Sequence, residues 1–454
     1  MAEKGNPSVY RYVAALVGAL LGVTNVVRAD NPIIQTIYTA DPAPYVWNNT
    51  LWLFADHDEN GSMTYNMKDW RLFSSTDMVN WRDWGVVMSL KTFSWAKADA
   101  WAGQVVARNG KFYYYVPMTR NGASYGIGVG VSDSITGPYK DALGKPLVAN
   151  GAIDPTVWID DDGQAYLYWG NPNLYWIKLN NDMVSYSGSI NNAQMSSFQG
   201  NFAEGPWFYK RNSTYYLVYA GHCCPEDIRY STATGPTGPW TYRGQVMATQ
   251  GASFTNHPGL IDYKGGSYFF YHNGALPGGS GYTRSIAVEK FSYGSDGSIP
   301  NMKMTTAGAP QIEPLDPYAR VEAETIAFSS GLSTEASNDG GLHVTSVNNG
   351  DYIKIGGVDF GAAPGAASVS LRVAAASGGG KIELRLGSLT GSLVATCAVD
   401  ATGGATTWKT VLCPLSGSAT GQHDLFFKFV GSGNQNLFNL NWWQFNKNGT
   451  AAAK

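Results

Sequence analysis

Three carboxylates in this chain stand at matching places in repeated sequence segments. Asp41, Asp154 and Glu204 each begin a segment that continues with a short apolar run, a turn and an aromatic-rich stretch. Carboxyl groups crowded together acquire different pKa values, so that one becomes an acid and another a base near neutral pH. Glycoside hydrolysis needs this division, because one group protonates the leaving oxygen while the other activates water or attacks carbon. The pattern therefore predicts an acid–base site of this kind.

Two further segments of the same pattern begin at Trp101 and His257. Each acid taken alone is compatible with an ordinary turn residue before Pro or Gly, but acids in three of five equivalent positions favour a functional site. Trp101 would supply a flat face on which a sugar ring stacks. The five segments read DPAPYVWNNTLWLFAD from Asp41, WAGQVVARNGKFYYYVP from Trp101, DPTVWIDDDGQAYLYWG from Asp154, EGPWFYKRNSTYYLVYAG from Glu204 and HPGLIDYKGGSYFFYHN from His257.

The elements that must position these residues are short strands. A second, turn-rich motif follows each segment, starting at Ser74, Ser132, Leu179, Ser231 and Phe291, and helical periodicity is absent. Repeats of this length with about four strands each are typical of a β-propeller, whose innermost strands would bring the five segment starts to one end of a central channel. We expect an all-β chain with a five-bladed β-propeller over residues 30–315. The alternative is two unrelated β-sandwiches with coincidental turns.

The sequence changes character after Pro310. The stretch QIEPLDPYAR is followed by short strands rich in Gly, Ala, Ser and Thr. This predicts a β-sandwich (jelly-roll) domain over 319–446 and a polar tail over 447–454. Cys397 and Cys413 lie in this part and are placed to bridge neighbouring strands, whereas Cys223 and Cys224 are adjacent and either form a vicinal disulfide or stay free thiols.

The N-terminus and the overall charge bear on location and partners. Residues 1–29 carry Lys4 and Arg11 before an apolar stretch and end in Val27-Arg28-Ala29, which predicts a signal peptide and a secreted protein; a membrane anchor is the alternative. The formal net charge of −3 indicates no nucleic-acid partner. We expect a monomer without a membrane partner. Glycosylation sequons occur at Asn48, Asn60, Asn212 and Asn448.

Residues 32–300 resemble glycoside hydrolase family 43. The resemblance is carried by Ala40-Asp41-Pro42, Ile153-Asp154-Pro155-Thr156 and Ala203-Glu204-Gly205-Pro206. It implies a five-bladed propeller that inverts configuration, with Asp41 as general base, Glu204 as general acid and Asp154 orienting the acid and raising its pKa. It also implies substrate contacts by His257 and Arg284. His257 either helps to hold a calcium ion at the axis, as in some members, or is a hydrogen-bonded structural group.

The overall run is most similar to arabinofuranosidases that act on arabinoxylan. We therefore expect release of α-L-arabinofuranosyl side chains from this plant cell-wall polysaccharide, with no cofactor for the chemistry. An exo-β-xylosidase or arabinanase with the same three acids is the alternative, as is a catalytically inactive polysaccharide-binding protein. The stretch GHCCPEDIRYSTATG departs from the family.

The C-terminal part, Tyr318 to Phe445, resembles a family 6 carbohydrate-binding module. The matching pieces are Tyr318-Ala319-Arg320-Val321-Glu322-Ala323-Glu324, Gly350-Asp351-Tyr352-Ile353, Thr407-Trp408 and Phe438-Asn439-Leu440-Asn441-Trp442-Trp443. The resemblance implies that Tyr352 and Trp408 clamp a sugar ring while Asn439 hydrogen-bonds it; alternatively, both aromatics belong to the sandwich core. It also implies a structural calcium ion at Glu322, Glu324 and Asn441, where an Asn stands in place of the more usual Asp.

Overall fold

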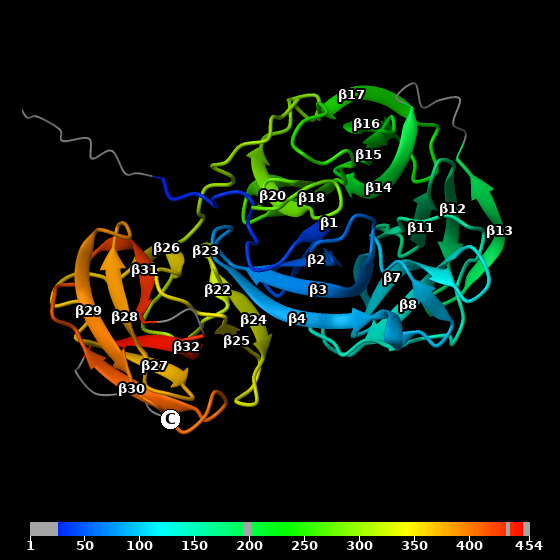
Figure 1. Cartoon of the computed structure of the whole chain (residues 1–454). Helices are drawn as coiled ribbons and strands as arrows, with labels where there is room; N and C mark the ends of the chain where they lie inside the picture. The colour runs from blue at the N-terminus through cyan, green and yellow to red at the C-terminus, as the bar shows by residue number, and fades with distance from the viewer. Residues whose placement is uncertain (1–25, 194–200, 433–435, 448–454) are drawn as a thin grey trace, which may run out of the picture.

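The computed structural model describes residues 26–193, 201–432 and 436–447 (Figure 1). The expected signal peptide lies almost entirely outside these residues, as do Asn448 and nearly all of the expected tail. The described part is built from strands, with one short 3₁₀ helix at Leu90–Thr92. Among the described residues, no helix has the length and apolar character needed to cross a bilayer.

Strands between residues 39 and 291 form five antiparallel sheets within the described chain. The first sheet contains β1 (Thr39–Trp47), β2 (Thr50–Asp58), β3 (Met67–Ser75) and β4 (Trp81–Ser89), and the second contains β5 (Ala96–Ala98), β6 (Gln104–Arg108), β7 (Lys111–Arg120), β8 (Tyr125–Ser132) and β9 (Lys140–Asp141). The third contains β10 (Thr156–Ile159), β11 (Ala165–Gly170), β12 (Leu174–Leu179) and β13 (Tyr186–Asn192). The fourth contains β14 (Phe202–Arg211), β15 (Thr214–Gly221), β16 (Asp227–Ala233) and β17 (Thr241–Met247), and the fifth β18 (Gly259–Tyr263), β19 (Gly266–Asn273) and β20 (Ser285–Phe291).

The repeated segments of the sequence are the first hairpin of each sheet. Tyr45 pairs with Trp52 across β1 and β2, and Trp158 pairs with Tyr166 across β10 and β11. The innermost strands β1, β6, β10, β14 and β18 together line a cavity of about 310 Å³ at one end of the axis. The sheets thus surround a central channel, which makes the N-terminal part a β-propeller (Figure 1).

The ring closes between its first and last sheets. The Thr39 N–H donates to the Arg284 carbonyl and the Ile33 N–H donates to the Ile286 carbonyl, both at 2.9 Å. The Asn31 side-chain amide also donates a hydrogen bond to the Val288 carbonyl at 3.1 Å. The segment before β1 therefore runs beside β20 and covers the edge of the three-stranded fifth sheet, which protects that edge from pairing with another chain.

Aromatic side chains fill the spaces between the sheets. Phe54 packs against Tyr114 with ring centroids 4.9 Å apart, and Tyr168 packs against Phe208 at the same separation. Trp70 is completely buried. Large flat rings bury much apolar area per residue, so the high aromatic content serves the core more than a ligand surface.

The C-terminal part is a β-sandwich with β strands in two sheets. One sheet has the order β24 (Ser333–Ala336), β25 (Leu342–Thr345), β32 (Asn439–Asn446), β27 (Ser368–Ala374) and β30 (Lys409–Pro414), with β21 (Val321–Glu322) also on β32. The other has the order β23 (Phe328–Ser330), β26 (Tyr352–Asp359), β31 (Gln422–Gly431), β28 (Gly380–Leu386) and β29 (Ser392–Val399).

Strand and side-chain contacts join the sandwich to the propeller. The strand β22 (Thr325–Ile326) pairs with β4 of the first propeller sheet. The Asn80 amide donates to the Gly356 carbonyl at 2.9 Å, and Thr334 donates to Asp83 at 2.8 Å. These buried polar contacts fix the orientation of the sandwich beside the first sheet (Figure 1).

All four cysteines form disulfides. Cys397 bonds to Cys413, as the sequence indicated, but the bond joins β29 to β30 and therefore links the two sheets of the sandwich instead of neighbours within one sheet. Cys223 bonds to Cys224, which realises the vicinal disulfide of the two alternatives.

Candidate active site

The three predicted carboxylates lie in one pocket at the end of the propeller channel opposite the apolar cavity. The pocket has a volume of about 230 Å³. Asp41, Trp101, Asp154, Glu204, His257 and Arg284, the six residues that the sequence placed in the catalytic site, all line it. The remaining lining residues are Tyr65, Met67, Ile153, Asn171, Cys223, Cys224 and Thr255.

Irregular backbone at the start of the inner strands aims the acids into the pocket. Asp41 has a φ of 51° and Asp154 a φ of 59°, both in the left-handed region that few non-glycine residues adopt. Glu204 precedes Gly205, whose φ is 60°, and the pairing register shifts at Asp41 and at Glu204. Such bulges turn a side chain out of the regular alternation, at a cost that active sites commonly carry.

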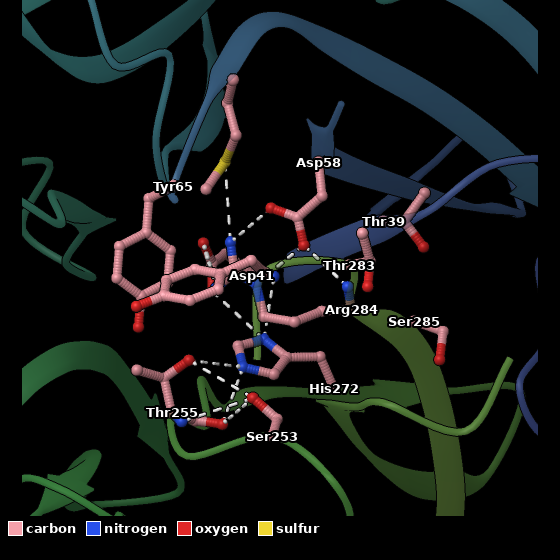
Figure 2. Close-up of polar contacts among 12 residues, drawn as sticks. Thr39, Asp41, Asp58, Tyr65, Ser253, Thr255, His272, Thr283, Arg284 and Ser285 are labelled. Atoms are coloured by element: carbon pink, nitrogen blue, oxygen red, sulfur yellow. Dashed lines mark hydrogen bonds and ion pairs between the residues drawn. The ribbon is translucent and has the colours of Figure 1, made fainter. Parts of the chain in front are cut away.

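The Arg284 guanidinium group and two histidine rings surround Asp41 and favour its ionised form. Arg284 donates to the Asp41 carboxylate at 3.2 Å, and the backbone N–H of Asp41 donates to His272 Nδ1 at 3.2 Å (Figure 2). Burial alone would raise the pKa of Asp41, but the charge of Arg284 and the contacts with His272 and His257 lower this pKa well below its usual value. Asp41 is thus equipped to accept a proton, as a general base requires.

Arg284 is fixed from a second side by another acid. Its Nε and Nη2 atoms donate to the two carboxylate oxygens of Asp58, each at 2.9 Å (Figure 2). The guanidinium group is 3% exposed, so the two carboxylates must offset the cost of burying its positive charge. The fork geometry of arginine allows both contacts at once, which a lysine does not reproduce.

Glu204 has the opposite electrostatic surroundings. Burial and the negative charge of Asp41 raise the pKa of Glu204, while hydrogen bonds from Asn171 and Glu226 oppose the rise. Asp154 accepts the backbone N–H of Gly205 at 3.0 Å and so braces the residue next to Glu204. Burial and the charge of Glu204 raise the pKa of Asp154 well above its usual value. The raised pKa of Glu204 suits a proton donor, as a general acid requires.

Aromatic side chains form one wall of the pocket. The Trp101 indole N–H donates to the Tyr65 carbonyl at 3.1 Å, which fixes the plane of the indole ring. Tyr65 lies with its ring 5.3 Å from the Arg284 guanidinium carbon. His257 Nδ1 lies 3.8 Å from Asp41 Oδ1, and burial lowers the pKa of His257 to about 4, so its ring is neutral near pH 7. These flat faces can pack against the apolar side of a sugar ring.

Several pocket residues were not predicted from the sequence. Asn171 follows the end of β11, and His272, which contacts Asp41 from outside the pocket lining, lies near the end of β19. In a hairpin the end of the second strand lies beside the start of the first. Residues just after each aromatic stretch could therefore have been predicted to lie next to the acids that begin each segment. Tyr65 and Thr255 come from long connections, for which the repeats give no register.

The sugar-binding residues predicted in the sandwich lie in two places. Tyr352 stacks near Phe328, with ring centroids 6.4 Å apart, on the sheet that contains β26. Trp408 instead donates its indole N–H to Asn338 at 2.7 Å, and its ring lies 5.3 Å from that of His343. The Asn439 amide donates to the Ala405 carbonyl at 2.9 Å, near the Trp408 loop. Among the described residues, no ring contact joins Tyr352 to Trp408.

The residues predicted to hold calcium differ in how their oxygens are satisfied. Glu322 pairs with Arg320 at 2.9 Å. Glu324 is 1% exposed and neither carboxylate oxygen accepts a hydrogen bond from a described residue, although Arg82 Nε lies 3.5 Å away. Asn441 is also buried, and its side-chain oxygen accepts no hydrogen bond from a described residue. Unpartnered buried oxygens are the donor set that a hard cation prefers, so Glu324 and Asn441 fit a calcium ligand role better than Glu322.

A pocket at the axis of a β-propeller that holds one carboxyl group with a lowered pKa and another with a raised pKa, together with a β-sandwich, is typical of a carbohydrate-cleaving enzyme with an accessory domain. The chain belongs to the glycosyl hydrolases family 43, whose family model matches residues 29–299. Residues 322–447 match the carbohydrate binding module family 6.

Individual relatives match over nearly the whole chain. The chain is 38% identical to an arabinoxylan arabinofuranohydrolase of Bacillus subtilis (strain 168), over 91% of this chain and 92% of that protein. It is 34% identical to an arabinoxylan arabinofuranohydrolase of Paenibacillus polymyxa, over 92% and 74% respectively. The crystal structure of a family 43 arabinoxylan arabinofuranohydrolase from Bacillus subtilis in complex with cellotetraose superposes with a TM-score of 0.81, covering 93% of this chain and 99% of that chain at 35% identity.

Proposed function

We propose that this protein is an α-L-arabinofuranosidase that removes arabinose side chains from arabinoxylan with inversion of configuration. The observation that carries the proposal is the pocket itself, in which Asp41, with a lowered pKa, and Glu204, with a raised pKa, share one small volume. The two relatives that span most of the chain are named for this activity. Family 43 enzymes need no cofactor for the chemistry.

The residue roles follow from the electrostatics of the pocket. Asp41 takes a proton from the water molecule that attacks the anomeric carbon. Glu204 gives its proton to the glycosidic oxygen as the carbon–oxygen bond breaks. Asp154 positions Glu204 by accepting the N–H of the neighbouring Gly205. Trp101 and His257 contact the sugar.

The product released from a polysaccharide tests the proposal. Arabinose appearing from wheat arabinoxylan, with the xylan backbone left intact, is the expected result by sugar chromatography. Xylose from xylobiose would instead identify a β-xylosidase, the activity for which a relative covering 60% of this chain at 25% identity is named. Glu204→Gln should abolish hydrolysis and retain binding to xylan; unchanged hydrolysis would remove Glu204 from the mechanism.

Further parts of the proposal concern the organisation of the chain. We propose that each of the five N-terminal sheets is one blade of a propeller over 30–315, that 319–446 is a carbohydrate-binding module, and that residues 1–29 direct secretion of a monomer. The sandwich would bind xylan through Trp408 and Asn439, with Tyr352 as a separate contact. A structural calcium ion would be held by Glu324 and Asn441, with Glu322 nearby in sequence.

A further inference from the structure

A further buried acid, Glu226, lies behind the wall of the pocket. It ends the segment 222–226 between β15 and β16, in which the Cys223–Cys224 disulfide lines the pocket. Glu226 is 3% exposed, and its carboxyl group lies close enough to that of Glu204 for each to shift the pKa of the other. A second carboxyl group in direct contact with the proton donor has no part in the mechanism derived so far.

The surrounding backbone holds the Glu226 side chain in one orientation. The Asn256 N–H donates to Glu226 Oε2 at 2.8 Å, and the Glu226 N–H donates to the Phe254 carbonyl at 3.1 Å. Thr249 donates to the Glu226 carbonyl at 2.8 Å. Oε1 accepts no hydrogen bond from the described residues, so this oxygen is the one available to Glu204.

A hydrogen bond between two carboxyl groups requires a proton on one of them. Burial and then the charge of Glu204 raise the pKa of Glu226 to about 10, whereas the pKa of Glu204 is raised by burial and by Asp41, and the influence of Glu226 opposes that rise. Glu226 therefore keeps its proton when Glu204 loses one. The other ionisable groups that face this pair are Asp41, Asp154, Tyr65 and Arg284.

We propose that Glu226 is a positioning residue which, as a neutral acid, donates a hydrogen bond to the carboxylate that Glu204 becomes when it protonates the leaving group. The inference rests on the proposed role of Glu204. The Glu204 proton moves to the glycosidic oxygen as that bond breaks, and Asp41 receives the proton of the attacking water. Glu226 and Asn171 then stabilise the new carboxylate, and exchange with solvent restores both groups.

Two substitutions separate this role from a structural one. Glu226→Gln keeps a neutral donor of the same shape, so both kcat and the alkaline limb of the pH profile should stay near those of the wild type. Glu226→Leu removes the donor, so kcat on arabinoxylan oligosaccharides should fall about tenfold or more, and the alkaline limb should move up by about one pH unit, because one bond to a charged group is lost. Glu289→Gln, at a buried glutamate outside the pocket, is the matched control and should leave the alkaline limb in place.

A substrate that needs no proton for departure provides the second measurement. With a dinitrophenyl α-L-arabinofuranoside, Glu226→Leu should approach wild-type kcat, because this leaving group departs as a stable anion. An equal loss on both substrates, an unmoved alkaline limb in Glu226→Leu, or a downward shift in Glu226→Gln would each overturn the inference. If Glu226→Leu fails to fold, the profile of Glu226→Gln alone decides. A wild-type protein that releases no arabinose would refute the proposed function separately.

Discussion

Replacing Arg284 by lysine tests whether the ionisation of Asp41 depends on the geometry of one guanidinium group. Arg284 donates at 2.9 Å to both oxygens of Asp58 and at 3.2 Å to Asp41. A lysine keeps the positive charge but cannot span both acids in this way. If the ammonium group stays on Asp58, Asp41 loses one charge-assisted bond, worth about 1.5–3 kcal/mol.

This loss converts directly into a shift of the pH profile. Since about 1.4 kcal/mol corresponds to one pKa unit, the pKa of Asp41 should rise by about one to two units. Asp41 acts only when deprotonated and its pKa is depressed in the folded enzyme, so activity is lost as the pH falls through that pKa. A higher pKa makes the loss begin at a higher pH, and the acidic limb of kcat/KM moves up by the same one to two units.

The acidic limb should be measured on soluble arabinoxylan oligosaccharides, with thermal unfolding recorded for each variant. Arg71→Lys provides the matched control, because Arg71 pairs with Asp69 at 3.2 Å outside the pocket lining. An acidic limb that stays in place in a folded Arg284→Lys protein would refute the claim that Arg284 controls Asp41. A shift of the alkaline limb alone would place its influence on Glu204 instead.

Three further predictions concern the sandwich. Replacing Cys397 and Cys413 together by alanine should lower unfolding stability by about 3 kcal/mol, measured by denaturant titration, because the bond closes a short loop between two sheets. Trp408→Ala should weaken retention on insoluble xylan and leave hydrolysis of soluble oligosaccharides unchanged; equal retention would place binding elsewhere. Chelation by EDTA should lower the melting temperature of the wild type and have no effect in Glu324→Gln, whereas equal responses would exclude Glu324 as a calcium ligand.

The repeats allowed the catalytic pocket to be predicted because each marks one hairpin of one sheet. Asp41, Asp154 and Glu204 were predicted from the number of residues that separates each of them from the next aromatic strand. In a hairpin this number fixes where a residue lies relative to the second strand. The prediction failed to include residues such as Tyr65, whose long connection has no periodic signal. It also missed Asp58, since a buried acid within a strand cannot be distinguished by pattern from a solvent-facing one.

In the sandwich, the sequence motifs do not fix where the predicted sugar-binding residues lie relative to one another. Tyr352 and Trp408 were predicted to form one clamp; in the structure the Tyr352 ring neighbours Phe328 and the Trp408 ring neighbours His343. Which face of the sheet a residue presents depends on the pairing of distant strands, and Tyr352 on β26 pairs with Lys428 on β31. Short motifs identify the domain without fixing how its loops approach one another.

The distribution of protons in the pocket follows from the position of one cation. Around Arg284 and the catalytic pair lie the partly buried Glu204 and the buried acids Asp41, Asp56, Asp58, Asp154 and Glu226. Burial opposes the charge of every one, and Arg284 lies against Asp41 and Asp58. Asp56, Asp154 and Glu226, which it does not contact, have raised pKa values, as has Glu204. Because Arg284 comes from β19–β20 and contacts β1 and β2 across the closure of the ring, the same contacts that close the propeller also decide which carboxyl group is the base.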